Sequence, residues 1–180
     1  LISIAGKPMI AHVCARASAS QAAEIVVATD DQRIFEVVSQ LKINAEMTDP
    51  NHQSGTERIA EVADRLGWHD DEIIVNVQGD EPLIPTEYIE QLAAALASQP
   101  EIGVATLAAK IDDPEELFNP NAVKVVLNQN GVALYFSRAP IPWDRDLFAK
   151  SHTQLSALMP HYRHIGMYAY RVGFLKRYCK

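Results

Sequence analysis

The chain has 180 residues, of which 48% are hydrophobic and 22% are charged. These proportions are typical of a globular protein with one sizeable core. The formal net charge of −7 argues against a nucleic acid or an anionic membrane surface as the main partner. No apolar run is long enough to predict membrane insertion. The two cysteines, Cys14 and Cys179, have no metal-type spacing, and we expect a cytoplasmic protein with reduced thiols.

Helices and strands alternate along the first 110 residues. Short apolar runs predict strands, and apolar positions at helical spacing predict the helices between them. The expected strands are 24–29, 45–48, 73–77 and 104–109. The first expected helix begins at Pro8, and the others follow Asp31, Ser54 and Thr86. This alternation predicts an α/β fold with a mostly parallel, Rossmann-like sheet and helices on both faces.

The strand around Ile73–Val77 ends in an acidic turn, Gly79-Asp80-Glu81-Pro82. Ligands of open α/β sheets bind beyond the carboxyl ends of the strands, which is where Asp80 lies. Hard oxygen donors suit Mg²⁺, which often takes one or two protein carboxylates and completes its shell with phosphates and water. The sequence therefore makes Asp80 a candidate magnesium ligand. A second interpretation is that Asp80 only caps the turn before the next helix.

A polar loop, His52–Arg58, precedes the helix that begins after Ser54. Ser54 and Glu57 have the spacing of a capping box. The free N–H groups of such a helix start favour an anion or the edge of a base. A capped helix without a ligand explains Ser54 and Glu57 fully, but it explains Gly55 and Arg58 less well. Asp30 also follows a strand, and for it a helix cap is the preferred interpretation.

The pattern changes after residue 110. Strands at 123–127 and 132–136 are joined by Asn128-Gln129-Asn130-Gly131, and Asn-Gly is a strong hairpin signal. We expect a single domain over 1–180 in which residues 118–160 form an inserted hairpin and loop extension, suited to dimerisation. A last strand over 161–171 would place His164 and Tyr168 on one face, within reach of one ligand. For His164 alone, a satisfied strand histidine is the competing interpretation.

Seven stretches taken in order resemble one family, the 3-deoxy-manno-octulosonate cytidylyltransferases, also called CMP-KDO synthetases. They are Gly6–Ile10, His52–Arg58, Val75–Pro82, Phe118–Val125, Tyr135–Arg138, Ile141–Arg145 and His164–Arg171. The resemblance implies a sheet of the nucleotide-diphospho-sugar transferase type and a homodimer. It also implies transfer of CMP from CTP to 3-deoxy-D-manno-octulosonate (KDO), with Mg²⁺, for lipopolysaccharide biosynthesis.

The resemblance assigns roles residue by residue. Asp80 corresponds to a catalytic magnesium ligand. Arg138 is the second catalytic candidate, and it is suited to a carboxylate, since the planar guanidinium matches its geometry. The remaining positions would bind substrate: Ser54, Gly55, Thr56 and Arg58 the cytidine, and Gln78, His164 and Tyr168 the sugar acid.

The resemblance also implies that an N-terminal triphosphate-binding loop and a C-terminal segment with a second metal-binding aspartate are missing from these 180 residues. We therefore expect these residues alone to be inactive. Two other functions stay open: a related cytidylyltransferase acting on sialic acid, and a non-catalytic sugar-nucleotide-binding or dimerisation module. A dinucleotide-dependent dehydrogenase is disfavoured, because no glycine fingerprint follows any strand.

Overall fold

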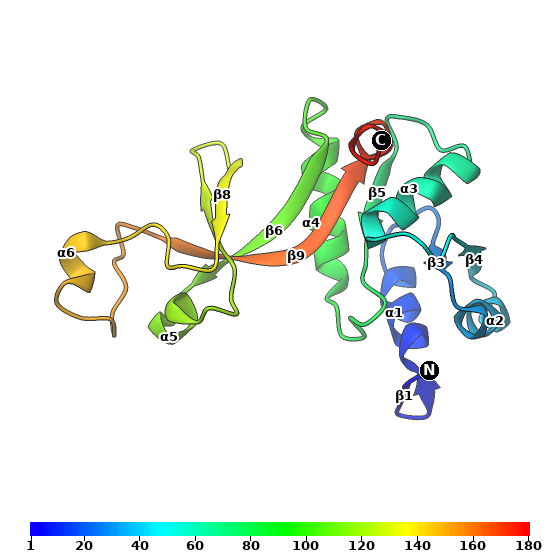
Figure 1. Cartoon of the computed structure of the whole chain (residues 1–180), viewed down its shortest axis with the longest axis horizontal. Coiled ribbons are helices and arrows are strands. Elements are labelled where there is room, and N and C mark those ends of the chain that lie inside the picture. The colour runs from blue at the N-terminus through cyan, green and yellow to red at the C-terminus, as the bar shows by residue number, and fades with distance from the viewer. The chain divides into compact units, whose positions relative to one another are not determined.

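The computed structural model describes residues 1–180, which divide into two compact units. The first unit comprises Leu1–Ala105 and Met167–Lys180, and the second comprises Thr106–Gly166. Two strands, β6 (Val104–Ile111) and β9 (His161–Arg171), begin in one unit and end in the other (Figure 1).

The first unit holds most of the helices. Its remaining elements are β1 (Ser3–Ile4), β2 (Lys7–Pro8), α1 (Met9–Ser18), β3 (Val26–Thr29), α2 (Gln32–Gln40), β4 (Asn44–Met47), α3 (Gly55–Arg65), β5 (Ile73–Asn76), α4 (Thr86–Ala97) and α7 (Val172–Tyr178). The helices and strands alternate as the apolar spacing predicts, so the expected α/β class is confirmed.

The strand pairing is mixed rather than mostly parallel, which corrects the predicted sheet. β3 and β4 pair in parallel, from Val26 opposite Asn44 to Thr29 opposite Met47. The long strand β9, however, lies antiparallel to β5, with Ile73 opposite Arg171 and Asn76 opposite Tyr168. The parallel prediction took each strand to pair with others of the helix–strand alternation. A strand from the far end of the chain pairs with β5 instead, and local periodicity carries no signal of that contact.

The helices bury the apolar faces that their spacing defines. In α4, Ile89, Leu92 and Leu96 are buried, three and four residues apart. A core cluster joins Ala60 of α3, Tyr170 of β9 and Leu175 of α7. Helix α3 is thus fixed by its buried face, while in its first turn Gly55 is exposed and Thr56 and Arg58 are partly buried.

The second unit contains the predicted hairpin. Its strands β7 (Lys124–Leu127) and β8 (Ala133–Ser137) are antiparallel, with Lys124 opposite Ser137. The Asn128 side chain accepts hydrogen bonds from the backbone N–H groups of Asn130 and Val132, both at 2.9 Å, which stabilises the turn. The hairpin prediction is confirmed.

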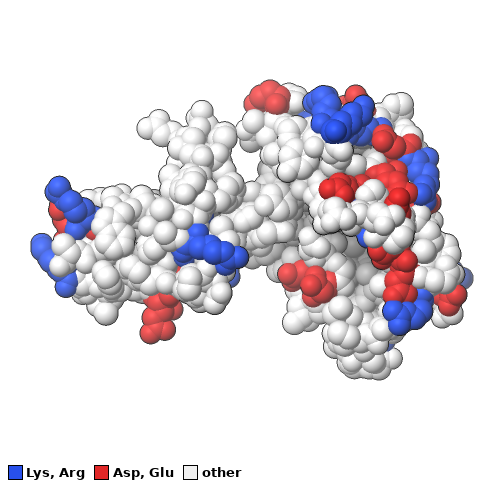
Figure 2. Space-filling model, viewed as in Figure 1, with Lys and Arg blue, Asp and Glu red and all other residues white.

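Two short helices, α5 (Pro114–Phe118) and α6 (Arg145–Phe148), complete the second unit. A small core joins Ile111, Leu117 and Phe148, and β7 pairs antiparallel with β9. None of the helices in the chain has the length and apolar character needed to span a membrane. On the face drawn in Figure 2, acidic and basic side chains are interspersed over the first unit, so that face presents no extended basic patch.

Candidate active site

The acidic turn that follows β5 is shaped by its backbone and leaves its side chains in solvent. The N–H of Glu81 donates to the Gln78 carbonyl, and the N–H of Ile84 donates to the Glu81 carbonyl, both at 3.2 Å. Gln78, Asp80 and Glu81 are exposed. The interpretation of Asp80 as a helix cap is not supported, because Pro85 is the N-cap residue of α4 and no side chain caps that helix.

The donor set of this turn suits magnesium held together with a substrate. No group of three or more His, Cys, Asp or Glu side chains in the chain could hold a metal ion unaided. Mg²⁺ does not need such a group, since it commonly takes one or two carboxylates and fills its octahedral shell with phosphate oxygens and water. An exposed carboxylate such as Asp80 fits that mode of binding.

The start of α3 is built around a capping box. The Ser54 hydroxyl accepts from the N–H of Glu57 at 3.2 Å, and the Glu57 carboxylate accepts from the N–H of Gln53 at 2.8 Å. The N–H groups of Gly55 and Thr56 belong to the first turn, where no carbonyl within the helix can pair with them. A Cβ atom built on Gly55 would meet nothing within 4 Å, so the space beside this glycine is open.

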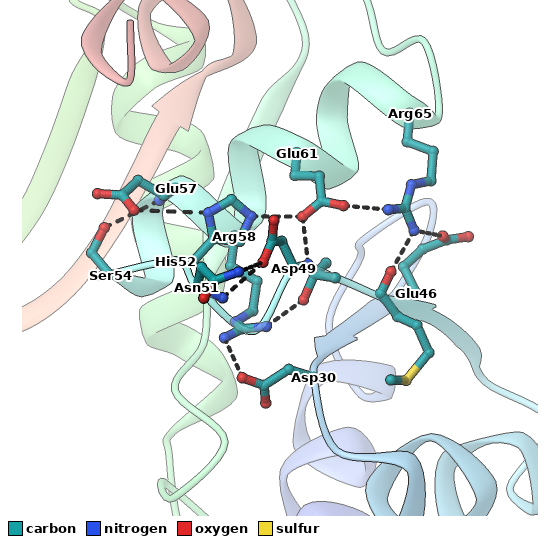
Figure 3. Close-up of polar contacts among 12 residues, drawn as sticks. Asp30, Glu46, Asp49, Asn51, His52, Ser54, Glu57, Arg58, Glu61 and Arg65 are labelled. Carbon is teal, nitrogen blue, oxygen red and sulfur yellow. Dashed lines mark hydrogen bonds and ion pairs between the residues drawn. The ribbon is translucent and has the colours of Figure 1, made fainter.

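Thr56 and Arg58 are tied to the body of the first unit. The Tyr170 hydroxyl hydrogen-bonds the Thr56 side chain. Arg58 donates to the Asp30 carboxylate at 2.8 Å and to the Thr48 hydroxyl, and its side chain is only 18% exposed (Figure 3). Arg58 therefore links the residues that follow β3 and β4.

Asp30 has a different role from the helix cap that we preferred. The cap of α2 is Asp31, which accepts from the N–H of Arg33 at 2.8 Å. Asp30 is left to pair with Arg58 across the two strand ends. Adjacent aspartates thus serve separate functions, and the sequence gives no signal of which one caps the helix.

A second polar group supports the loop before α3 and was missed in the sequence. His52 Nε2 lies 2.6 Å from Glu61 Oε2, and the same oxygen accepts from the N–H of Asp49 at 3.0 Å (Figure 3). These two contacts, the Asp49 N–H first and His52 second, lower the pKa of Glu61. Arg65 pairs with the other Glu61 oxygen. Glu61 of α3 therefore holds the loop over residues 49–54 in place.

Tyr168 lies beside the strand that leads to the acidic turn. It stands opposite Asn76 in the β5–β9 ladder, two residues before Gln78 in the chain. Its ring stacks on Tyr170 with centroids 6.0 Å apart. Burial, with the neighbouring Tyr170, raises the pKa of the Tyr168 phenol, so this side chain stays a neutral hydroxyl.

His164 belongs to the second unit, where it is partly buried. Its Nε2 lies 2.8 Å from the Thr106 hydroxyl, and its ring meets the Phe136 ring edge-on at 4.8 Å. Burial lowers the pKa of the imidazole. The histidine has the internal contact that the competing interpretation requires, and one ring nitrogen is engaged in it.

Arg138 and Lys124 hold one loop of the second unit. Arg138 is exposed and donates to the Pro120 carbonyl at 2.9 Å. Lys124 is fully buried and donates to the carbonyls of Asn119 and Ala122 at 2.8 and 2.7 Å. Burial, and then the Arg138 charge, lower the pKa of Lys124. The sequence suggested no role for Lys124, whose strand position is that of an ordinary exposed lysine.

Comparisons with known proteins identify the family of this chain. A family model described as cytidylyltransferase matches residues 1–180. The 3-deoxy-manno-octulosonate cytidylyltransferase of Hahella chejuensis is 60% identical over 178 residues, which are 99% of this chain and 70% of the relative. The chain belongs to the 3-deoxy-manno-octulosonate cytidylyltransferases.

Solved structures extend the comparison to the fold. A CMP:2-keto-3-deoxy-manno-octonic acid synthetase in complex with CTP matches with a TM-score of 0.86 and 41% identity, over 99% of this chain and 69% of that one. A 4-diphosphocytidyl-2C-methyl-D-erythritol synthase matches with a TM-score of 0.58 and 14% identity, over 99% of this chain and 72% of that one, and this likeness shows the fold alone. The predicted family, the nucleotide-sugar transferase type of fold and the nucleotidyltransferase class of this cytidylyltransferase are confirmed.

Proposed function

We propose that this cytidylyltransferase transfers CMP from CTP to the anomeric hydroxyl of KDO, releasing pyrophosphate and giving CMP-KDO for lipopolysaccharide biosynthesis. The observation that carries the proposal is 60% identity, over 99% of the chain, to a relative of that name. The CTP complex of a synthetase that is 41% identical supports CTP as the nucleotide.

The start of α3 is the proposed cytidine pocket. Ser54, Gly55, Thr56 and Arg58 lie in its first turn and cap. Ser54, Thr56 and Arg58 already have internal partners, so we assign them to a rigid frame. The N–H groups of Gly55 and Thr56 then supply the direct contacts with the base or ribose, through the open space beside Gly55.

Asp80 is the proposed magnesium ligand. Its exposed carboxylate has no hydrogen-bond or ion-pair partner within the chain, so binding an ion would break no internal contact. Bound Mg²⁺ would neutralise phosphate charge and lower the pKa of a coordinated hydroxyl. We assign the neighbouring Gln78, also exposed, to the sugar acid.

The family resemblance assigns three residues to the sugar acid: Tyr168 in the first unit, and His164 and Arg138 in the second. Tyr168 provides a phenol whose pKa burial raises, and His164 provides an imidazole whose pKa burial lowers. Arg138 provides a cation for the carboxylate, since only some of the N–H groups of its exposed guanidinium donate to backbone carbonyls.

The reaction needs no protein nucleophile. The anomeric hydroxyl oxygen forms a bond to the α-phosphorus of CTP and releases its proton to solvent. The bond from that phosphorus to the β-phosphate bridging oxygen breaks, and the electron pair leaves with pyrophosphate. Such transfers gain most of their rate from positioning and from electrostatic stabilisation. The chain's contribution is therefore to orient the two substrates and to exclude competing orientations.

The hairpin supports the proposal of a homodimer. Leu134 and Tyr135 of β8 are 64% and 62% exposed, which is unusual for large apolar side chains in a strand. A second copy would cover them. For the cytoplasmic location, the free thiols of Cys14 and Cys179 suit a reducing compartment.

The direct test is pyrophosphate release by the full-length protein with CTP and Mg²⁺, comparing KDO with sialic acid. Release with KDO and none with sialic acid is the expected result. Release with sialic acid alone would transfer the assignment to the related synthetases, and release with neither would favour a binding module.

A further inference from the structure

The loop before α3 is fastened to that helix by two glutamates one helical turn apart. Glu61 Oε2 lies 2.6 Å from His52 Nε2 and accepts from the N–H of Asp49 at 3.0 Å (Figure 3). Glu57 Oε2 accepts from the N–H of Gln53 at 2.8 Å. Residues four apart lie on the same face of a helix, so one face of α3 receives the contacts of all three loop residues.

Glu61 is the central acceptor of this arrangement. Its pKa is lowered, chiefly by the Asp49 N–H, so the carboxylate is ionised at neutral pH and its oxygens only accept. His52 Nε2 therefore donates to it. The other carboxylate oxygen pairs with Arg65, which also donates to the carbonyl of Met47 at the end of β4. The side chains of Glu61 and His52 are only 24% and 21% exposed, so water screens their contact less than that of a surface pair.

These contacts act on the residues that lead into the first turn of α3. The N–H groups of Gly55 and Thr56 have no partner within the helix, and helix ends fray unless they are held. The fastened residues come directly before the Ser54 cap, so they limit fraying at this end. The loop does not fill the space beside Gly55, where an added Cβ would meet nothing within 4 Å. The start of α3 is thus held without being covered.

We propose that Glu61 is a positioning residue of the nucleotide site. Through His52 and Asp49 it holds the loop against α3, which keeps the N–H groups of the first turn in the arrangement that the cytidine of CTP requires. The inference rests on the proposed function, in which these N–H groups contact the nucleotide. Glu61 acts through the loop, because its two oxygens are engaged by partners within the chain.

The test uses the full-length protein and changes both sides of the contact. Glu61→Ala removes the acceptor, and His52→Leu removes the donor while keeping much of the volume. His52→Gln keeps an amide N–H and is the conservative variant. Glu36→Ala is the matched control, because Glu36 is an exposed glutamate of α2 whose carboxylate accepts from Gln32 of the same helix. Pyrophosphate release gives kcat and the two KM values, and hydrogen exchange with mass spectrometry reports the backbone over residues 49–56.

We expect the KM for CTP to rise about 3- to 10-fold in Glu61→Ala and His52→Leu, as for one lost hydrogen bond. Exchange over residues 49–56 should become faster in both, while kcat and the KM for KDO stay unchanged. His52→Gln and Glu36→Ala should behave like the wild type. The double variant should resemble Glu61→Ala alone, since both substitutions remove the same contact.

Two results would overturn the positioning role. One is an unchanged KM for CTP in Glu61→Ala and His52→Leu, whether or not exchange becomes faster. The other is an equal rise in the KM for CTP and the KM for KDO, which would indicate a general loss of structure.

Failure of the proposed nucleotide site is recognised separately with Gly55→Ala. The added methyl group has open space in the chain, so it should leave the fold intact and obstruct only a bound nucleotide. If Gly55→Ala leaves the KM for CTP unchanged, CTP does not bind beside the start of α3, and the positioning role of Glu61 is overturned with that site. If Gly55→Ala raises this KM and Glu61→Ala does not, only the positioning role is overturned.

Discussion

The acidic turn after β5 and the first turn of α3 both lie in the first unit, and they differ in how their polar side chains are satisfied. Gln78, Asp80 and Glu81 are exposed, with no side-chain partner. At the start of α3, by contrast, Ser54 caps the helix and Arg58 bridges Asp30 and Thr48. Side chains that are already paired can form a rigid frame, which holds the free backbone N–H groups of the first turn in place. Unpaired carboxylates are available to a ligand. We therefore assign the metal ion to the acidic turn and the cytosine base of CTP to the start of α3.

The largest effect is expected from Asp80→Asn. This change removes the charge that would hold Mg²⁺, and the loss of several kcal/mol of charge stabilisation corresponds to a fall in kcat of about 100-fold or more. The free energy of unfolding should not change, since Asp80 is exposed and unpaired. Pyrophosphate release and urea denaturation measure the two quantities. Glu101→Gln, at another exposed and unpaired acidic residue, is the control, and equal activities of the two variants would contradict the assignment.

Arg58→Met should affect both stability and CTP binding. The substitution leaves Asp30 without its cation and Thr48 without its donor, in a place where the Arg58 side chain is largely buried. We expect a loss of about 2 kcal/mol in the free energy of unfolding, as for a hydrogen-bonded charge, together with a higher KM for CTP. Arg33→Met breaks an exposed ion pair with Asp31 and should cost less. If urea denaturation gives the same loss in the free energy of unfolding for both variants, the contacts of Arg58 with Asp30 and Thr48 stabilise the protein no more than an exposed ion pair does.

Ser54→Ala removes the cap of α3 and should cost about 1 kcal/mol of stability. Ser54→Asn keeps an acceptor at the cap and should stay close to the wild type. If Ser54 contributes to the cytidine pocket only by capping α3, the KM for CTP should rise in Ser54→Ala, which loses stability, and stay unchanged in Ser54→Asn, which keeps it. A large rise in that KM for Ser54→Asn, with stability retained, would instead indicate direct contact between the hydroxyl and the nucleotide.

The smallest effect is a pH dependence at Glu61. Its pKa is lowered from an ordinary value of 4.5 in the folded protein, first by the Asp49 N–H and then by His52. A lowered folded pKa contributes stability that is present above the unfolded pKa and is lost as pH falls through the folded pKa. The stability difference between wild type and Glu61→Gln should therefore be largest near neutral pH and shrink below pH 4.5. Parallel stability curves from chemical denaturation would exclude this contribution, and Glu101→Gln serves as the control.

The features that the sequence predicted well depend on local signals. The capping box at Ser54 and Glu57 involves residues three apart, and the turn of the β7–β8 hairpin is encoded by Asn130-Gly131. Helical spacing likewise identified the buried face of α4. In each case the residues that decide the structure are neighbours in the chain, so their pattern can be recognised without the fold.

The features that the sequence did not predict are long-range. The pairing of Ile73 with Arg171 brings β9 beside β5 and changes the sheet from mostly parallel to mixed. Asp31 caps α2, whereas Asp30 pairs with Arg58, 28 residues further along. Lys124 is buried by tertiary packing and satisfied by two backbone carbonyls, which no periodicity signals. The roles of the site residues toward their substrates stay predictions.

The most direct test of the account is the binding of Mn²⁺, as a paramagnetic substitute for Mg²⁺, by the full-length protein in the presence of CTP. Electron paramagnetic resonance would compare the wild type with Asp80→Asn and Glu101→Gln. We predict that Asp80→Asn weakens Mn²⁺ binding about tenfold or more, equivalent to about 1.4 kcal/mol, while Glu101→Gln binds like the wild type. Equal affinity in all three proteins would contradict the claim that the unpaired carboxylate of the acidic turn is the metal ligand.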